Sequence, residues 1–256
     1  MKITIQDVEF SYNGFPVLKN VNNKFEKGDL VALVGPNGSG KSTLIKCMNG
    51  ILKVRKGTVL IDDRSISSFS PNELAREMAY VPQSENRKAV LNVFDIVLLG
   101  RKPYINWKPT EQDLRITSDI LNSLNLDHLA MRDFNKLSGG QQQSVYIARA
   151  LAQEPDILLL DEPIANLDIR HQIEVLDLLK SLSQKGITVI IALHDINMAA
   201  RYASKIMMLR DGKVFAGGGR EIITKENIEN LYDIKVKIIE NNGHTFIIPD
   251  GLQKHH

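Results

Sequence analysis

The spacing of apolar and polar residues divides the chain into strand-like and helix-like segments. Residues 3–12 alternate apolar and polar side chains as a half-exposed strand does, whereas residues 30–34 are continuously apolar, which is typical of a buried central strand. Further strands are expected over 57–63, 77–83, 156–163 and 188–195, with a hairpin over 205–218 around Asp211-Gly212. Helical spacing occurs over 41–50, 90–99, 111–124, 141–152 and 171–186. The segment from about 220 predicts a short helix followed by two strands.

This order of elements predicts an α/β fold in one domain over residues 1–256. Strands that alternate with helices favour a mixed, largely parallel sheet, preceded here by an N-terminal antiparallel β portion. Residues 84–150 lack β-rich runs and are expected to form a helical lobe inserted into the core. The core would then consist of 1–83 and 151–256.

Composition narrows the class of protein without deciding its function. The 256 residues are 43% hydrophobic and 24% charged, with a net charge of +2, which is too balanced to favour a nucleic-acid partner. No apolar run approaches the roughly 18 residues of a membrane span. The first ten residues include Asp7 and Glu9 and do not resemble a signal peptide. Cys47 is the only cysteine, so no intrachain disulfide is possible, which fits a reducing cytosol.

Residues 35–43, GPNGSGKST, match the phosphate-loop pattern G-x-x-x-x-G-K-[S/T] between a predicted strand and a predicted helix. Glycines allow the backbone to wrap phosphates closely, Lys41 would reach the β- and γ-phosphates, and the Ser42 hydroxyl would hold Mg²⁺. The pattern predicts a P-loop NTPase (RecA-like) core with ATP and Mg²⁺ as cofactors. The expected binding residues are Gly35, Pro36, Asn37, Gly38, Ser39, Gly40, Lys41, Ser42 and Thr43.

Two adjacent carboxylates, Asp161 and Glu162, lie at the end of the apolar run in ILLLDEP, residues 157–163. Buried strand ends do not usually carry such a pair without a cation partner. Asp161 would act on Mg²⁺ through its water shell. Glu162, directed to the other side by strand alternation, would take the proton of an attacking water. The alternative is that one carboxylate caps the following helix.

Three further side chains are candidates for the same site, each with a structural alternative. His194 ends a buried strand at the sheet edge where ligands bind and is expected to contact the γ-phosphate, although a lone histidine there is often structural. Gln83 could contact Mg²⁺ or the attacking water, or be a surface glutamine. Tyr12 could stack on adenine, or be a partly buried strand aromatic.

A second phosphate-binding arrangement lies at residues 136–143, KLSGGQQQ. Ser138, Gly139 and Gly140 precede or open a predicted helix, followed by Gln141, and a helix N-terminus favours an anion. The chain therefore has two devices for binding phosphate, about a hundred residues apart.

The motifs GPNGSGKST, Gln83, LSGGQ, LLLDEP, NLD at 166–168 and His194 occur together in this order, and together they resemble the ATP-binding subunit of ABC transporters. The resemblance runs over nearly the whole chain. It implies ATP hydrolysis by a head-to-tail homodimer that holds two ATP molecules between its subunits. Ser138 and the glycines after it would face the γ-phosphate bound by the partner's loop. The family also implies a role at the site for Asp168.

Segments 93–104, 167–176 and 193–203 resemble the importers of iron–siderophore chelates, haem and cobalamin, with molybdate or tungstate importers also similar. This implies an integral-membrane permease dimer, contacted through about 84–107, where Tyr104 and Trp107 lie. It also implies an extracytoplasmic substrate-binding protein and a peripheral position on the cytoplasmic face of the membrane.

The chain departs from the family pattern at Ile164, Ala165-Asn166, Gln142 and Gln143, without loss of a catalytic group. One alternative function is a soluble ABC ATPase, such as a cofactor-assembly factor. DNA-repair types carry long coiled coils and ribosome-acting types carry two ATPase units, and neither occurs here. A nucleotide-binding module without turnover is the remaining alternative, and the intact Glu162 and His194 argue against it.

Overall fold

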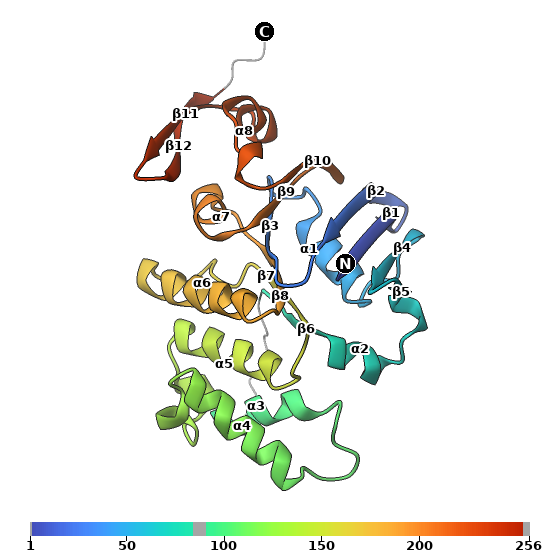
Figure 1. Ribbon diagram of the computed structural model, residues 1–256, viewed down its shortest axis with the longest axis vertical. Helices are drawn as coiled ribbons and strands as arrows, with labels where there is room; N and C mark the ends of the chain where they lie inside the picture. The colour runs from blue at the N-terminus through green and yellow to red at the C-terminus, as the bar shows by residue number, and fades with distance from the viewer. Residues whose placement is uncertain (1, 84–90, 253–256) are drawn as a thin grey trace.

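The computed structural model describes residues 2–83 and 91–252, which fold into three sheets with helices around them (Figure 1). The first sheet is antiparallel, as the N-terminal alternation predicts. Its strands, in spatial order, are β2 (Phe15–Phe25), β1 (Ile3–Tyr12), β4 (Lys56–Ile61) and β5 (Arg64–Ser65).

The second sheet has six strands and is largely parallel, as predicted. Its strands, in spatial order, are β10 (Lys213–Gly218), β9 (Lys205–Arg210), β3 (Leu30–Val34), β8 (Thr188–Ala192), β7 (Ile157–Asp161) and β6 (Met78–Val81). Only the pairing of β10 with β9 is antiparallel. The predicted hairpin between them is confirmed, because Asp211 and Gly212 form the turn with φ values of 51° and 78°.

The strand β3 is buried on both faces because each face meets a different core. Leu30, Ala32 and Val34 pack with α5 (Gly139–Leu151), α6 (Ile169–Gln184), α7 (Ile196–Tyr202) and α8 (Lys225–Tyr232). Val31 and Leu33 pack with α1 (Lys41–Met48) and the antiparallel sheet. The period-two alternation of a strand therefore explains the continuous apolar run.

Cys47 lies in this second core and is fully buried, in agreement with the expected helix after the phosphate loop. Burial raises the pKa of its thiol to about 12.

The helices α3 (Val93–Leu98) and α4 (Glu111–Ser123) lie with α5 at one end of the molecule (Figure 1). They enclose a separate apolar cluster that includes Val97, Leu121 and Val145. The helix α5 also contributes Ile147 and Ala150 to the core against the large sheet, so it joins the two regions. The division into a core and an inserted lobe at 84–150 stays a prediction, and residues 84–90 lie outside the described part of the chain.

The hairpin of β11 (Ile234–Asn241) and β12 (His244–Leu252) lies at the opposite end of the molecule (Figure 1). Asn197 of α7 holds it by a reciprocal pair of hydrogen bonds with the backbone of Ile247, at 3.1 and 2.7 Å. The predicted helix and two strands after residue 220 are therefore confirmed.

Two helices were not expected from the apolar pattern. They are α2 (Pro71–Glu77) and α7, each seven residues long, which is too short for helical periodicity to stand out. A capping box between Ser70 and Glu73, with Pro71 in the first turn, begins α2. This start signal is readable in the sequence. Within residues 2–83 and 91–252, no helix is both long and apolar enough to cross a bilayer.

Candidate ATP-binding site

The phosphate loop connects β3 to α1 and depends on glycine for close backbone packing. Gly35 has a φ of 146°, and a Cβ placed there would lie 2.0 Å from the carbonyl oxygen of Leu209. Gly40, with a φ of 102°, precedes α1, and a Cβ there would lie 2.8 Å from the Leu18 side chain. Gly38, at 79°, has no neighbour within 4 Å in the described part of the chain, and its backbone conformation favours glycine.

Donors without an anionic acceptor gather inside this loop. Lys41 Nζ donates to the carbonyl oxygens of Gly35 at 2.8 Å and Pro36 at 3.2 Å, and the residue is only 5% exposed. Burial lowers the pKa of Lys41, and the charges of Glu162 and Asp161 partly oppose this shift. The Ser39 hydroxyl is buried and has no hydrogen-bond partner among the residues that the structure describes. A phosphate group would supply an anionic acceptor to both side chains, so the loop fits a nucleotide.

Oxygen ligands suited to Mg²⁺ meet beside the loop. Ser42 Oγ donates to Asp161 Oδ1 at 2.7 Å, which joins the start of α1 to the end of β7. Burial and the neighbouring Asp161 carboxylate raise the pKa of the Tyr80 hydroxyl well above its usual value. Mg²⁺ keeps several waters and takes few protein oxygens. The hydroxyl of Ser42 and the carboxylate of Asp161 therefore fit that ion.

Glu162 lies just beyond the end of β7, between two side chains from distant parts of the sequence. Gln83 Nε2 donates to Glu162 Oε2 at 2.6 Å, and His194 Nε2 lies 2.5 Å from Glu162 Oε1. The amide nitrogen of Gln83 faces Glu162, and its side-chain carbonyl oxygen is the atom that could bind a cation or water. The φ of Glu162 is 52°. A left-handed turn therefore directs this side chain, and the prediction of simple strand alternation is wrong on that point.

Asp168 caps α6, the helix that follows this turn. Its carboxylate accepts from the backbone N–H of His171 at 2.9 Å and pairs with His171 Nδ1 at 2.8 Å. The hydrogen bond from the His171 backbone is the main cause that lowers the pKa of Asp168, and the His171 side chain adds to it. The alternative that Asp161 or Glu162 caps this helix is wrong, because Asp168 occupies the cap position.

The sequence LSGGQ begins α5, as predicted. Ser138 is the cap residue and forms reciprocal hydrogen bonds with Gln141, at 3.3 and 3.1 Å. A Cβ placed on Gly139 would have no atom of residues 2–83 or 91–252 within 4 Å, whereas one on Gly140 would lie 2.4 Å from the His171 ring. Among the described residues, no hydrogen bond joins this segment to the phosphate loop.

The remaining predicted site residues have less defined surroundings. Tyr12 ends β1, is 44% exposed and packs edge-on against Phe10 with ring centroids 4.8 Å apart. Its role at adenine stays a prediction, as do the individual roles of the other predicted site residues.

Arg101 is a structural residue that sequence reasoning missed. It is 3% exposed and donates to Asp113 at 3.0 Å, to the Ala152 carbonyl at 2.8 Å and to Glu154 at 2.7 Å. Its guanidinium also lies over the Tyr104 ring, 4.0 Å from the centroid. It therefore fixes the segment after α3 against α4 and the end of α5. A buried arginine carries no pattern that reveals it in advance.

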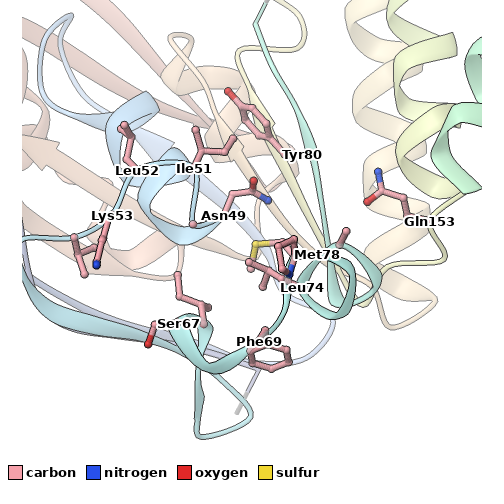
Figure 2. A pocket seen from close by; sticks show the side chains of 15 residues that line it. Asn49, Ile51, Leu52, Lys53, Ser67, Phe69, Leu74, Met78, Tyr80 and Gln153 are labelled. Carbon is pink, nitrogen blue, oxygen red and sulfur yellow. The ribbon is translucent and has the colours of Figure 1, made fainter. Parts of the chain in front are cut away.

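A largely apolar cavity of about 630 Å³ lies beside the site. Figure 2 shows Leu74, Met78 and Phe69 close together on one side of the cavity, with Tyr80 and Gln153 apart from them. Tyr80 belongs both to this cavity and to the surroundings of Asp161, so the cavity adjoins the Ser42–Asp161 pair.

Comparison with known proteins agrees with this geometry. The family model described as ABC transporter matches residues 18–165. An uncharacterised ABC transporter ATP-binding protein of Methanocaldococcus jannaschii is 45% identical over 98% of this chain and 99% of its own length. The ferric enterobactin transport ATP-binding protein of Escherichia coli is 35% identical, over 96% and 93%.

Among solved structures, a metal-chelate type ABC transporter in an inward-facing conformation superposes with a TM-score of 0.85. It is 33% identical, and the match covers 97% of this chain and 96% of the other. The P-loop, the carboxylates at the end of β7 and these matches together show that the chain belongs to the ABC transporter family, as one of its ATP-hydrolysing, ATP-binding subunits.

Proposed function

We propose that the chain is the ATPase of an importer for iron chelates, in which ATP binding and hydrolysis drive a membrane permease. The observation that carries hydrolysis is the position of Glu162, held by Gln83 and His194 next to the Ser42–Asp161 pair. A carboxylate so placed can accept the proton of a water that attacks the terminal phosphate.

Both oxygens of Glu162 already have a partner in this structure. Each carboxylate oxygen keeps a second lone pair for a water, and release by Gln83 or His194 would make the carboxylate a stronger acceptor. Nucleotide would draw His194 to the γ-phosphate and Gln83 to the cation, which frees Glu162 as the base. Mg²⁺, held through Ser42, Asp161 and Gln83, would neutralise charge on the phosphates.

We further propose that two copies close head to tail around two ATP molecules. Gly139 supports this arrangement, because no atom of the described residues lies within 4 Å of a Cβ placed there. Packing among residues 2–83 and 91–252 therefore gives no reason for a glycine at this position. A phosphate bound by the partner's loop would come close to this helix start and require the small residue.

The permease is proposed to dock on the cavity in Figure 2 and on the described part of the segment about 84–107. The cavity is largely apolar, and Ile51, which lines it, is 55% exposed. Leu99, which directly follows α3, is 52% exposed. Trp107 is 95% exposed. Tyr104 donates to the carbonyl of Gln153, a cavity residue, at 2.8 Å, so the segment adjoins the cavity. Large exposed apolar residues gathered in one place favour a protein partner.

The chain would then lie on the cytoplasmic face of the membrane, and a substrate-binding protein would reach the permease from outside. The relative named for ferric enterobactin and the metal-chelate type transporter support an iron chelate as cargo. Haem, cobalamin, molybdate and tungstate are the other candidates.

The test is co-expression with the neighbouring permease gene, followed by purification and uptake assays in proteoliposomes. We expect a membrane complex that takes up a ferric siderophore only with ATP. Uptake of haem, cobalamin or an oxyanion instead would overturn the iron-chelate assignment alone. Recovery only in a soluble complex would favour the alternative, a cofactor-assembly ATPase.

A further inference from the structure

His171 of α6 lies between two parts of the chain that the proposed function treats separately. On one side its Nδ1 pairs with Asp168 Oδ2 at 2.8 Å, and its backbone N–H donates to Asp168 Oδ1 at 2.9 Å. On the other side its ring covers Gly140 at the start of α5. A Cβ placed on Gly140 would lie 2.4 Å from Cδ2, 2.7 Å from Cγ and 3.1 Å from Nε2 of that ring.

The contact explains why Gly140 is a glycine in this chain. A separation below 3 Å requires one of the two groups to move, and Asp168 holds the imidazole from the opposite side. Gly139, one residue earlier, has no such neighbour in the described part of the chain. Gly140 is therefore required by packing against His171, whereas the proposed reason for Gly139 is the partner's phosphate.

The next residue, Gln172, extends the connection toward the catalytic turn. Its Nε2 donates to the carbonyl oxygens of Ile164 at 3.2 Å and Leu167 at 3.1 Å. These carbonyls lie in the loop that runs from Glu162 to Asp168. The first turn of α6 thus holds this loop at Ile164, Leu167 and Asp168 and contacts the start of α5.

We infer that His171 is a positioning residue, which fixes Asp168 and the start of α5 as one unit. This inference rests on the proposed function. The surface that each subunit offers to its partner's ATP, at Ser138–Gly140, would then move together with the loop that carries its own base, Glu162. Closure on one nucleotide would align the carboxylate at the other.

The first test is a mutant cycle on the purified full chain, measuring kcat at saturating ATP. Gly140→Ala should displace the imidazole and cost about 10- to 100-fold, as small displacements in an active site do. In a His171→Asn background the added methyl has no ring to meet, so Gly140→Ala should cost about twofold or less. Gly139→Ala is the matched control and should cost the same in both backgrounds. Equal losses for Gly140→Ala in both backgrounds would overturn the inference.

The second test separates positioning from general destabilisation. His171→Ala should lower kcat about tenfold or more and weaken ATP-driven dimerisation, while ATP affinity of the monomer stays unchanged, because His171 does not contact the phosphate loop. His171→Asn keeps a donor for Asp168 and should recover part of kcat. Arg170→Ala is the control, because the Arg170 side chain is 86% exposed and donates to Glu174 in the same helix at 2.9 Å.

The outcomes distinguish this inference from the proposed function. If the wild-type chain neither dimerises with ATP nor hydrolyses it, the proposed function fails. If the wild-type chain does both and His171→Ala matches Arg170→Ala in kcat and dimerisation, the positioning role of His171 is refuted.

Discussion

The replacement Glu162→Gln tests the central catalytic assignment with little change in shape. Glu162 accepts hydrogen bonds at both carboxylate oxygens, from Gln83 and from His194. A glutamine keeps one acceptor, which Gln83 can use. His194 can change tautomer and accept from the new amide nitrogen. Both contacts survive without charge assistance, so we expect the free energy of unfolding to fall by no more than about 1–2 kcal/mol.

The effect on catalysis should be much larger, because an amide cannot accept the proton of the attacking water. Loss of a general base costs about 10²- to 10⁴-fold in rate, which corresponds to about 2.7–5.4 kcal/mol of transition-state stabilisation. Phosphate release at saturating ATP measures this loss, and size-exclusion chromatography with ATP should show an accumulated dimer.

Glu174→Gln provides the control, because Glu174 is a 52% exposed residue of α6 paired with Arg170. It should leave the rate unchanged. If Glu162→Gln hydrolysed ATP at the wild-type rate, Glu162 would not be the base. If Glu162→Gln unfolded at a much lower urea concentration, the tautomer argument would be wrong.

Three further predictions concern the interface and the stability of the helical region. Ser138→Arg should leave ATP binding by the monomer nearly intact but abolish dimerisation and hydrolysis. Equilibrium binding that is weakened as much as in Lys41→Ala would contradict a role at the partner's nucleotide. Arg101→Met should lower the free energy of unfolding by about 3–5 kcal/mol in urea titrations, because it leaves the buried Asp113 carboxylate without its cationic partner. A decrease below about 1 kcal/mol would argue that the buried ion pair does not stabilise the fold. Burial raises the pKa of Asp113, but hydrogen bonds from Thr110 and Arg101 outweigh it and the net pKa is lowered. The ionised Asp113 carboxylate therefore stabilises the fold above its unfolded-state pKa of about 4, and this stabilisation is lost as the pH falls through the lower folded-state pKa. The difference in urea midpoint between wild type and Asp113→Asn should therefore shrink in acid.

Sequence reasoning succeeded where one local signal fixes one local structure. The apolar run before GPNGSGKST became β3, the lysine and serine after it opened α1, and Ser138 became the cap of α5. The short helices α2 and α7 were missed because seven residues complete fewer than two turns. For α2 the capping box of Ser70 and Glu73 was a usable signal.

The sequence by itself therefore determined three local features: a phosphate loop, two carboxylates at the end of a strand and a capped helix start with two glycines. Each depends on neighbours in the chain, such as glycine conformations, cap residues and apolar periodicity. Only the tertiary structure decided that Gln83 and His194 hold opposite oxygens of Glu162, and that His171 covers Gly140. These contacts join residues on different elements, and their geometry depends on how strands and helices pack, which periodicity along one chain does not encode.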